Sequence, residues 1–130
     1  MGGLKVHVRP EKLAEYYKQK YPLTFAKIPI DKELMERYEK AWNIAKEAAK
    51  ILKQDFGASK VAVFGSLTDL SAFTLWSDVD LAVWGVPESR FYAAVGAVTG
   101  LPSDFQIDVI DATDCRERLT KSIESEGVEL

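Results

Sequence analysis

The sequence is poor in the residues that build disulfide bonds, histidine sites and membrane spans. Its 130 residues include one cysteine, Cys115, and one histidine, His7. An intrachain disulfide is therefore excluded, and neither residue is expected to be catalytic or to bind a metal. No apolar run approaches the roughly 20 residues that cross a bilayer, so no membrane partner is expected. Without a disulfide framework or a signal peptide, the sequence predicts a cytoplasmic protein.

Positive charge is scarce in the second half of the chain. Residues 1–60 carry 13 Lys and Arg against 8 Asp and Glu, whereas residues 61–130 carry 4 against 12. An acidic half is typical of a solvated surface, but it also arises where carboxylates gather to hold cations. In the basic half the charges alternate in sign, as on an ordinary helix face, so there is no direct evidence for a nucleic-acid partner.

The rest of the composition is that of one globular domain. With 47 % hydrophobic and 28 % charged residues, the chain has enough apolar material for a core. Periodicity and breakers predict, in chain order, a strand at 4–8, a helix at 10–21, a helix from the N-cap Asp31 to Gly57, a strand at 60–64, a helical turn at 66–71, a strand at 79–84, a helix at 87–97, a strand at 105–110 and a helix at 114–124. This alternation predicts an α/β (α+β) fold with helices on at least one sheet face. We assign residues 1–30 to an N-terminal helical extension and residues 31–130 to the domain.

Two acids stand at the head of an otherwise apolar strand. Because side chains alternate along a strand, Asp78 and Asp80 point the same way, with Cα atoms about 6.6 Å apart. Asp108 stands between apolar neighbours in the strand at 105–110, so three carboxylates converge if the two strands are neighbours. Carboxylates that are buried together repel one another unless cations occupy the cluster. Oxygen ligands suit Mg²⁺, and two such ions about 3.5–4 Å apart form the clamp used in nucleotidyl transfer. The alternative is that these acids simply lie in water.

A glycine and a serine follow the strand at 60–64. Gly65 lets the backbone come close to a ligand, and Ser66 offers a hydroxyl and a backbone N–H at the start of a helical turn. Alone, this pair is more often a plain turn. Followed by the two acids and then by Asp108, it predicts a phosphate-binding site beside a metal site.

Together these motifs resemble those of the DNA polymerase β-type nucleotidyltransferase superfamily, and more narrowly the minimal nucleotidyltransferases of prokaryotes. The matching text is FGS (64–66), SDVDLAV (77–83) and IDV (107–109), and the ending IESEGVEL is also similar. The resemblance covers residues 51–130. It implies a small mixed sheet flanked by helices. It also implies Gly65 and Ser66 on the nucleoside triphosphate, Asp78 and Asp80 on Mg²⁺ or Mn²⁺, and Asp108 as third ligand or base.

The resemblance also implies a reaction and a partner. The expected reaction is adenylyl transfer from ATP, or from another nucleoside triphosphate, to an acceptor hydroxyl. About 60 N-terminal residues hardly suffice for an acceptor domain, so the acceptor is expected on another macromolecule. Minimal nucleotidyltransferases often act as antitoxins of HEPN-type RNases, some by placing AMP on a tyrosine. A small-molecule enzyme of the aminoglycoside type is one alternative. The oligomeric state, including a homo-oligomer, is left open.

One departure from the family pattern concerns the residues after the glycine–serine pair. The family commonly continues with x-A-R-G, whereas this chain has Asp69 at the position of the arginine. An acid there favours a further alternative, a catalytically weak or inactive module that neutralises a partner by occlusion.

Three groups of residues remain outside the motifs. Trp76 is expected to pack its loop, or else to stack on a base. The acids around the last strand are interpreted as turn and cap residues; they are Asp104, Asp111 and Asp114. One of four cations is expected to contact phosphates; these are Arg90, Arg116, Arg118 and Lys121.

Overall fold

The computed structural model describes residues 32–114 and 117–130. The predicted strand and helix before Asp31, the N-cap at Asp31 itself and the boundary of the extension lie outside these residues. The expectations for His7, Cys115 and Arg116 lie outside them as well.

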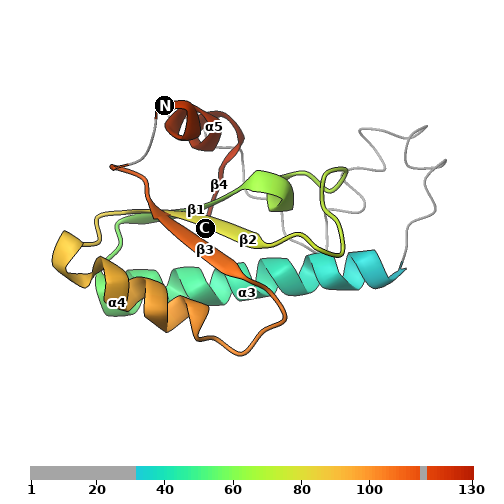
Figure 1. The fold of residues 1–130 in the computed structure, drawn as a ribbon, viewed down its shortest axis with the longest axis horizontal. Coiled ribbons are helices and arrows are strands. Elements are labelled where there is room, and N and C mark those ends of the chain that lie inside the picture. Colours follow the sequence, from blue (N-terminus) through green and yellow to red (C-terminus); the bar gives the residue numbers. More distant parts are fainter. Residues whose placement is uncertain (1–31, 115–116) are drawn as a thin grey trace.

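The described residues form three layers (Figure 1). In chain order the elements are α3 (Lys32–Phe56), β1 (Lys60–Phe64), the 3₁₀ turn η1 (Gly65–Thr68), β2 (Val79–Trp84), α4 (Glu88–Thr99), β3 (Ile107–Asp111), α5 (Glu117–Glu126) and β4 (Val128–Glu129). The sheet lies in the middle, with α5 on one face and with α3 and α4 on the other (Figure 1).

The sheet is mixed, which confirms the predicted fold class. Its four strands have the order β3-β2-β1-β4. β1 is antiparallel to both β2 and β4, and β2 is parallel to β3. Consequently β1 ends at the same end of the sheet at which β2 and β3 begin. We call this the acid end, because Asp78, Asp80 and Asp108 all lie at the starts of β2 and β3.

The predicted bounds of β1 and β2 are confirmed, and the other elements differ by a few residues. β3 begins two residues later than predicted, because the Ser103 hydroxyl engages both the N–H and the C=O of Phe105 at 3.2 Å and holds it in a bend. Asp114 lies in a turn and not in the closing helix, since its N–H donates to the C=O of Asp111. The strand β4 was not predicted.

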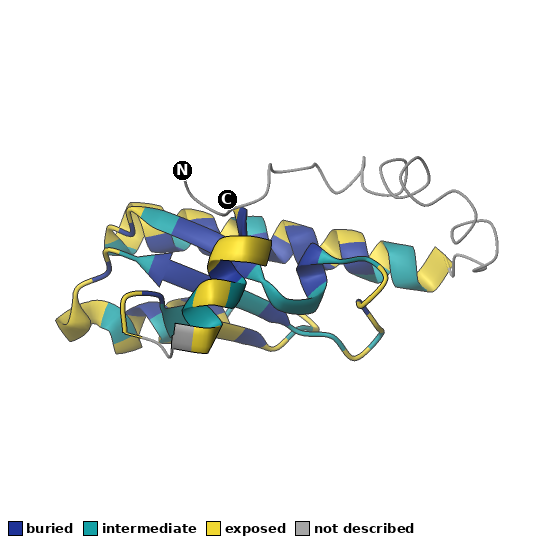
Figure 2. Ribbon diagram, turned by 90° about the horizontal axis from the view of Figure 1, so that it is seen from above, coloured by how far each residue is buried: buried dark blue, intermediate teal, exposed yellow. Residues whose placement is uncertain are grey.

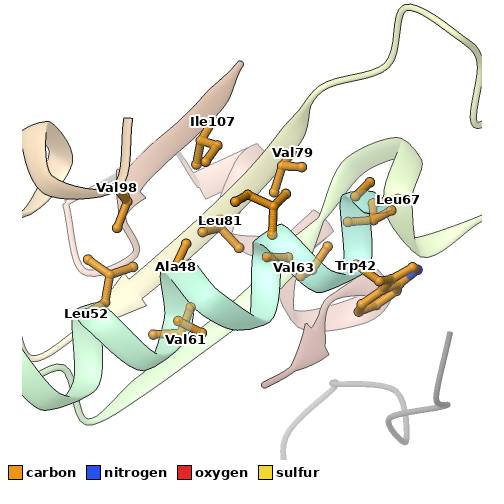
Figure 3. Packing of buried hydrophobic residues seen from close by; sticks show 14 of the residues in the cluster. Trp42, Ala48, Leu52, Val61, Val63, Leu67, Val79, Leu81, Val98 and Ile107 are labelled. Carbon is orange, nitrogen blue, oxygen red and sulfur yellow. The ribbon is translucent and has the colours of Figure 1, made fainter. Parts of the chain in front are cut away.

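One apolar stripe packs α3 against the sheet. Its spacing predicts this packing, and Tyr38, Ala45 and Leu52 are fully buried. Figure 3 shows Ala48 and Leu52 of α3 in the same cluster as Val61 of β1. Most of the buried residues belong to the cluster on this face. Burial of each large side chain contributes about 1.5–3 kcal/mol.

The opposite face of the sheet has a smaller core. Ile123 of α5 is buried together with Ala82 and Ala112, and Ile110 packs against them. α5 covers only part of this face, and its outer turns are exposed (Figure 2). Along β2 and β3, therefore, even-numbered residues face α5 and odd-numbered ones face α3 and α4. Among the described residues, no helix combines the length and the apolar character needed to cross a bilayer.

Candidate active site

The fold brings two of the predicted acids into register. Asp80 of β2 and Asp108 of β3 are paired neighbours in the parallel strands, and Asp80 is also paired with Phe64 at the end of β1. Both acids lie on the face that α5 covers in part, because they share the parity of Ala82 and Ile110. The condition for convergence, that the two strands are neighbours, is therefore met, and Asp78 directly precedes β2 on the same side.

The carboxylates at the acid end act on one another. The pKa of Asp80 is raised from 3.8 to about 6, first by burial and then by the charges of Asp108 and Asp78. A hydrogen bond between the Asp80 and Asp108 side chains raises it further. The Gln106 side chain donates to Asp108 Oδ1 at 3.1 Å. The negative charge is thus crowded at one point, which is the situation that a bound cation relieves.

The donor chemistry of this cluster fits a divalent cation held jointly with a substrate. Within residues 32–114 and 117–130, no three His, Cys, Asp or Glu side chains are arranged to hold a metal ion by themselves. Mg²⁺ does not require such a cage, because it is usually bound through one or two carboxylates and completed by waters and substrate phosphates. Asp80 with Asp108, next to Asp78, offers this incomplete oxygen set.

Gly65 brings the backbone against the acids. Its φ is +76°, a conformation in which glycine is favoured. A Cβ at this position would lie 2.5 Å from Asp80 Oδ2, so a side chain cannot fit without displacing the carboxylate. The half-buried Ser66 follows in η1, which the Thr68 hydroxyl closes by donating to the C=O of Gly65 at 2.7 Å. The predicted glycine–serine pair therefore adjoins the predicted acids.

Asp69, which stands where the family pattern has arginine, organises the loop after η1. Its Oδ1 accepts hydrogen bonds from the Ser71 N–H at 3.0 Å and from the Ser71 hydroxyl at 2.6 Å. Its own N–H donates to the C=O of Ser66 at 3.1 Å. The acid is thus used in the turn, where its carboxylate accepts hydrogen bonds from local donors.

Trp76 projects from the loop that leads into β2. Its side chain is 84 % exposed, so the expectation that it packs the loop is wrong. The loop is ordered by its polar residues: the Thr74 N–H donates to Ser77 Oγ at 2.8 Å, and the Trp76 N–H donates to Thr74 Oγ1 at 3.2 Å. Because local hydrogen bonds close this loop, the indole is not needed to fill it, and it is presented to solvent two residues before Asp78.

One acid and one cation of the remaining candidates lie at the end of the sheet away from the cluster. Asp111 is the last residue of β3, where it is paired with Val83 at the opposite end of the sheet. Its Oδ1 accepts from the Thr113 N–H at 2.9 Å, so its side chain caps the turn that follows the strand. Arg90 also lies at that end and donates to the C=O of Asp55 at 3.0 Å. Arg90 is therefore not the phosphate contact. Two further cations, Arg118 and Lys121, are exposed on α5.

Two residues that sequence reasoning did not connect with the site support it from α3. Arg37 donates to the C=O of Ser77 at 3.3 Å, and the Tyr38 hydroxyl donates to the C=O of Leu67 at 2.8 Å. Both lie in the second turn of the long helix, where a charged residue beside an aromatic one is common. The sequence held no clear signal for their role, because each contact spans about 30 to 40 residues.

Solved structures of toxin–antitoxin complexes share this fold. The chain is similar to one in the MntA–HepT complex with a TM-score of 0.50 and 15 % identity, over 68 % of this chain and 69 % of that one. A toxin–antitoxin complex with AMP-PNP is similar at a TM-score of 0.53 and 17 % identity, over 65 % and 70 % of the chains. A variant of the MntA complex, in which two aspartates two positions apart are replaced by glutamate, is similar at a TM-score of 0.54 and 15 % identity. The match covers 65 % of this chain and 70 % of that one. No protein-family model matches the chain, and no curated protein matches its sequence. The likeness confirms the predicted fold, that of the minimal nucleotidyltransferase MntA.

Proposed function

We propose that this chain is a metal-dependent nucleotidyltransferase that transfers the adenylyl group of ATP to a hydroxyl on a partner protein. The observation that carries the proposal is the meeting of three features at the acid end. Asp80 and Asp108 are in register, Asp78 adds charge beside them, and Gly65 leaves room only for the Asp80 carboxylate. A purely structural strand start has no use for this crowding of negative charge, whereas a cation and a triphosphate would balance it.

Each residue has a role in this reaction. Asp78 and Asp80 would hold Mg²⁺, as one or two ions, or Mn²⁺, and Gly65 and Ser66 would bind the triphosphate. When bound, the metal offsets the negative charge of the phosphates and favours attack at the α-phosphorus. The acceptor oxygen forms a bond to the α-phosphorus while the bond to the pyrophosphate oxygen breaks. Asp108 would serve either as a third metal ligand or as the base that takes the proton of the acceptor hydroxyl. The protein contributes mainly position and electrostatic stabilisation.

We further propose that the acceptor belongs to a HEPN-type partner that this chain silences as an antitoxin. Support comes from the structural neighbours, which are toxin–antitoxin complexes, one of them with AMP-PNP. The two substituted aspartates of the third neighbour have the same spacing as Asp78 and Asp80. In this view residues 31–130 are the transferase domain, and residues 1–30 are an extension to it.

A second candidate function is neutralisation by occlusion without transfer. Asp69 favours this candidate, because it puts an acid where the family pattern has an arginine. Its carboxylate accepts hydrogen bonds from Ser71. In that case the fold and the partner are the same, but the acids are not required for neutralisation.

One experiment separates the two candidates. The purified protein is incubated with isotopically labelled ATP, Mg²⁺ and the product of the adjacent gene, and the intact masses are measured. Transfer adds one adenylyl group to the partner, and the double variant Asp78→Asn/Asp80→Asn adds none. A tight complex without a mass change, together with unimpaired neutralisation by the double variant, establishes occlusion instead.

A further inference from the structure

Arg37 reaches from α3 to both chain segments that carry the acids. Its Nη2 donates to the C=O of Ser77, the residue before Asp78, at 3.3 Å. The guanidinium carbon lies 4.2 Å from the centroid of the Phe105 ring, in the segment that leads to Asp108. A planar guanidinium can make both contacts at once, because it stacks on a ring while its edge donates a hydrogen bond. One side chain thus ties the entrance of β2 to the entrance of β3.

The partial burial of Arg37 is costly for stability. Its Nε is buried and has no hydrogen-bond partner. A buried donor without a partner loses its hydration with nothing in exchange, and the cost is higher when the group is charged. A residue kept at such a cost is expected where the geometry of a site depends on it.

The next residue along α3 supports the other loop of the site. The hydroxyl of the buried Tyr38 donates to the C=O of Leu67 in η1, the turn that begins with Gly65. Its ring packs at 4.9 Å and 72° against Phe73, which also lies in the loop before β2. Successive residues of one helix therefore hold the turn that carries the glycine–serine pair and the loop that carries Asp78.

Arg37 acts on the acids through the backbone and not by touching them. α3 packs on the odd-numbered face of the sheet, whereas Asp80 and Asp108 point to the other face. We propose that Arg37 is a positioning residue that fixes the distance between the Asp78 and Asp108 segments, so that their carboxylates can share a divalent cation. This inference rests on the proposed function and names a residue that the family motifs do not include.

The chain offers a matched control in Arg90. Its guanidinium lies 4.9 Å from the centroid of the Phe56 ring, and its Nη2 donates to the C=O of Asp55 at 3.0 Å. Each arginine thus stacks on a phenylalanine ring and donates to a backbone carbonyl. Arg37 lies on α3 and makes these contacts at the acid end, whereas Arg90 contacts α3 at the end of the sheet away from the three acids. If Arg37 served only to hold the helix, replacing either arginine would have the same effect on the acid end.

The test measures Mn²⁺ binding in the presence of AMP-PNP by calorimetry. The full-length wild type is compared with Arg37→Gln, Arg37→Lys and Arg90→Gln. We expect Arg37→Gln to weaken Mn²⁺ binding at least about 10-fold, which is the low end for residues that orient metal ligands. Arg37→Lys keeps the charge but loses the planar stack, so its Mn²⁺ affinity should lie between those of the wild type and Arg37→Gln. Arg90→Gln should bind within about 2-fold of wild type. With the partner present, the loss for Arg37→Gln should appear in kcat, while KM for the partner is unchanged.

The outcomes are distinguishable from a failure of the proposed function. If the wild type does not bind Mn²⁺, the proposed function and this inference both fall. If the wild type binds and a folded Arg37→Gln binds equally well, the proposed function stands and Arg37 is not a positioning residue. An equal loss in Arg90→Gln also overturns the inference, since it indicates a general loosening of α3. If circular dichroism shows that Arg37→Gln does not fold, the same criterion is applied to Arg37→Lys. Weaker Mn²⁺ binding than wild type then supports the inference, and equal binding overturns it.

Discussion

At both ends of the sheet a strand is followed by a glycine with positive φ, but the two glycines have different neighbours. Gly65, with a φ of +76°, directly follows β1, and Gly85, with a φ of +85°, directly follows β2. A Cβ would meet Asp80 Oδ2 at 2.5 Å in the first case and Ser59 Oγ at 2.8 Å in the second. At the acid end the neighbour is a carboxylate with a raised pKa, and at the opposite end it is a hydroxyl.

The polar groups at the two ends also differ in how they are satisfied. At the opposite end the polar groups are satisfied locally: the Ser59 N–H donates to the C=O of Trp84 at 2.8 Å, and Asp111 accepts from Thr113. At the acid end, burial and the charges of Asp108 and Asp78 disfavour the ionised form of Asp80 and raise its pKa. Unfavourable charge of this kind is typical of sites that bind a counter-charge.

The largest expected effect comes from Asp80, with Asp111 as the control at the other end. Asp80→Asn removes a charged oxygen from the centre of the cluster, so it should abolish metal-dependent ATP binding and lower transfer by more than about 10³-fold. Asp111→Asn keeps an oxygen that accepts from Thr113, so ATP affinity and transfer rate should both stay within about 2-fold of the wild-type values. If Asp80→Asn and Asp111→Asn behave alike in calorimetry and in the transfer assay, the two ends of the sheet do not differ in function.

The next largest effect concerns Asp108. As an attacking-side ligand or base it acts mainly in the transition state, so Asp108→Asn should keep most Mg²⁺–ATP affinity and lose transfer by at least about 10²-fold. Single-turnover rates at saturating ATP measure this loss. Asp104→Asn, in the exposed loop before β3, serves as the control. A near wild-type rate for Asp108→Asn would remove it from the reaction.

The two glycines separate stability from binding. Gly65→Ala and Gly85→Ala should each lower the free energy of unfolding by about 1–2 kcal/mol or more, because both positions have left-handed backbone and a close neighbour. Only Gly65→Ala should also weaken ATP binding, since its Cβ displaces the Asp80 carboxylate. Urea denaturation and nucleotide titration of both variants test this. Equal effects on ATP affinity would mean that Gly65 is an ordinary turn residue.

The smallest expected effect is a pH dependence of stability without metal. Between about pH 4 and 6 folded Asp80 retains a proton that the unfolded chain releases, since its pKa rises from 3.8 to about 6 on folding. Its contribution to stability therefore falls as pH rises through this window and stays low above it. In EDTA, Asp80→Asn should be more stable than wild type at pH 8 by about 1 kcal/mol, after allowance for solvent screening of a half-exposed group.

Melting curves at several pH values measure the difference between the two proteins. The advantage of Asp80→Asn should shrink as the pH falls and approach zero near pH 3, below both pKa values, where Asp80 is protonated in both states. An advantage that is the same at pH 3 and pH 8 would show that the carboxylate charge is not its cause.

The sequence predicted the parts of the molecule that depend on local pattern. The bounds of β1 and β2 follow from short apolar runs that end at Gly65 and Gly85, and the packing of α3 follows from its apolar stripe. The convergence of Asp80 with Asp108 followed from strand alternation, given that the two strands are neighbours. These features need no knowledge of distant contacts, apart from the pairing itself.

The parts that were missed depend on specific contacts, two of them long-range, that the sequence pattern does not reveal. β4 has two residues and is defined only by its pairing with β1, through Val128 and Val63. The exposure of Trp76 follows from hydrogen bonds that close its loop without it. The role of Arg37 depends on a carbonyl 40 residues away, and in the sequence it is one more charge on a helix.

The most direct test of the account is calorimetry of ATP binding with Mg²⁺ and with EDTA. The central claim is that the acid end is a joint site for a divalent cation and a nucleotide. The account predicts that the wild type binds ATP more tightly with Mg²⁺ than with EDTA, and that Asp78→Asn or Asp80→Asn removes this difference. Equal ATP affinity of the wild type with and without metal would contradict it.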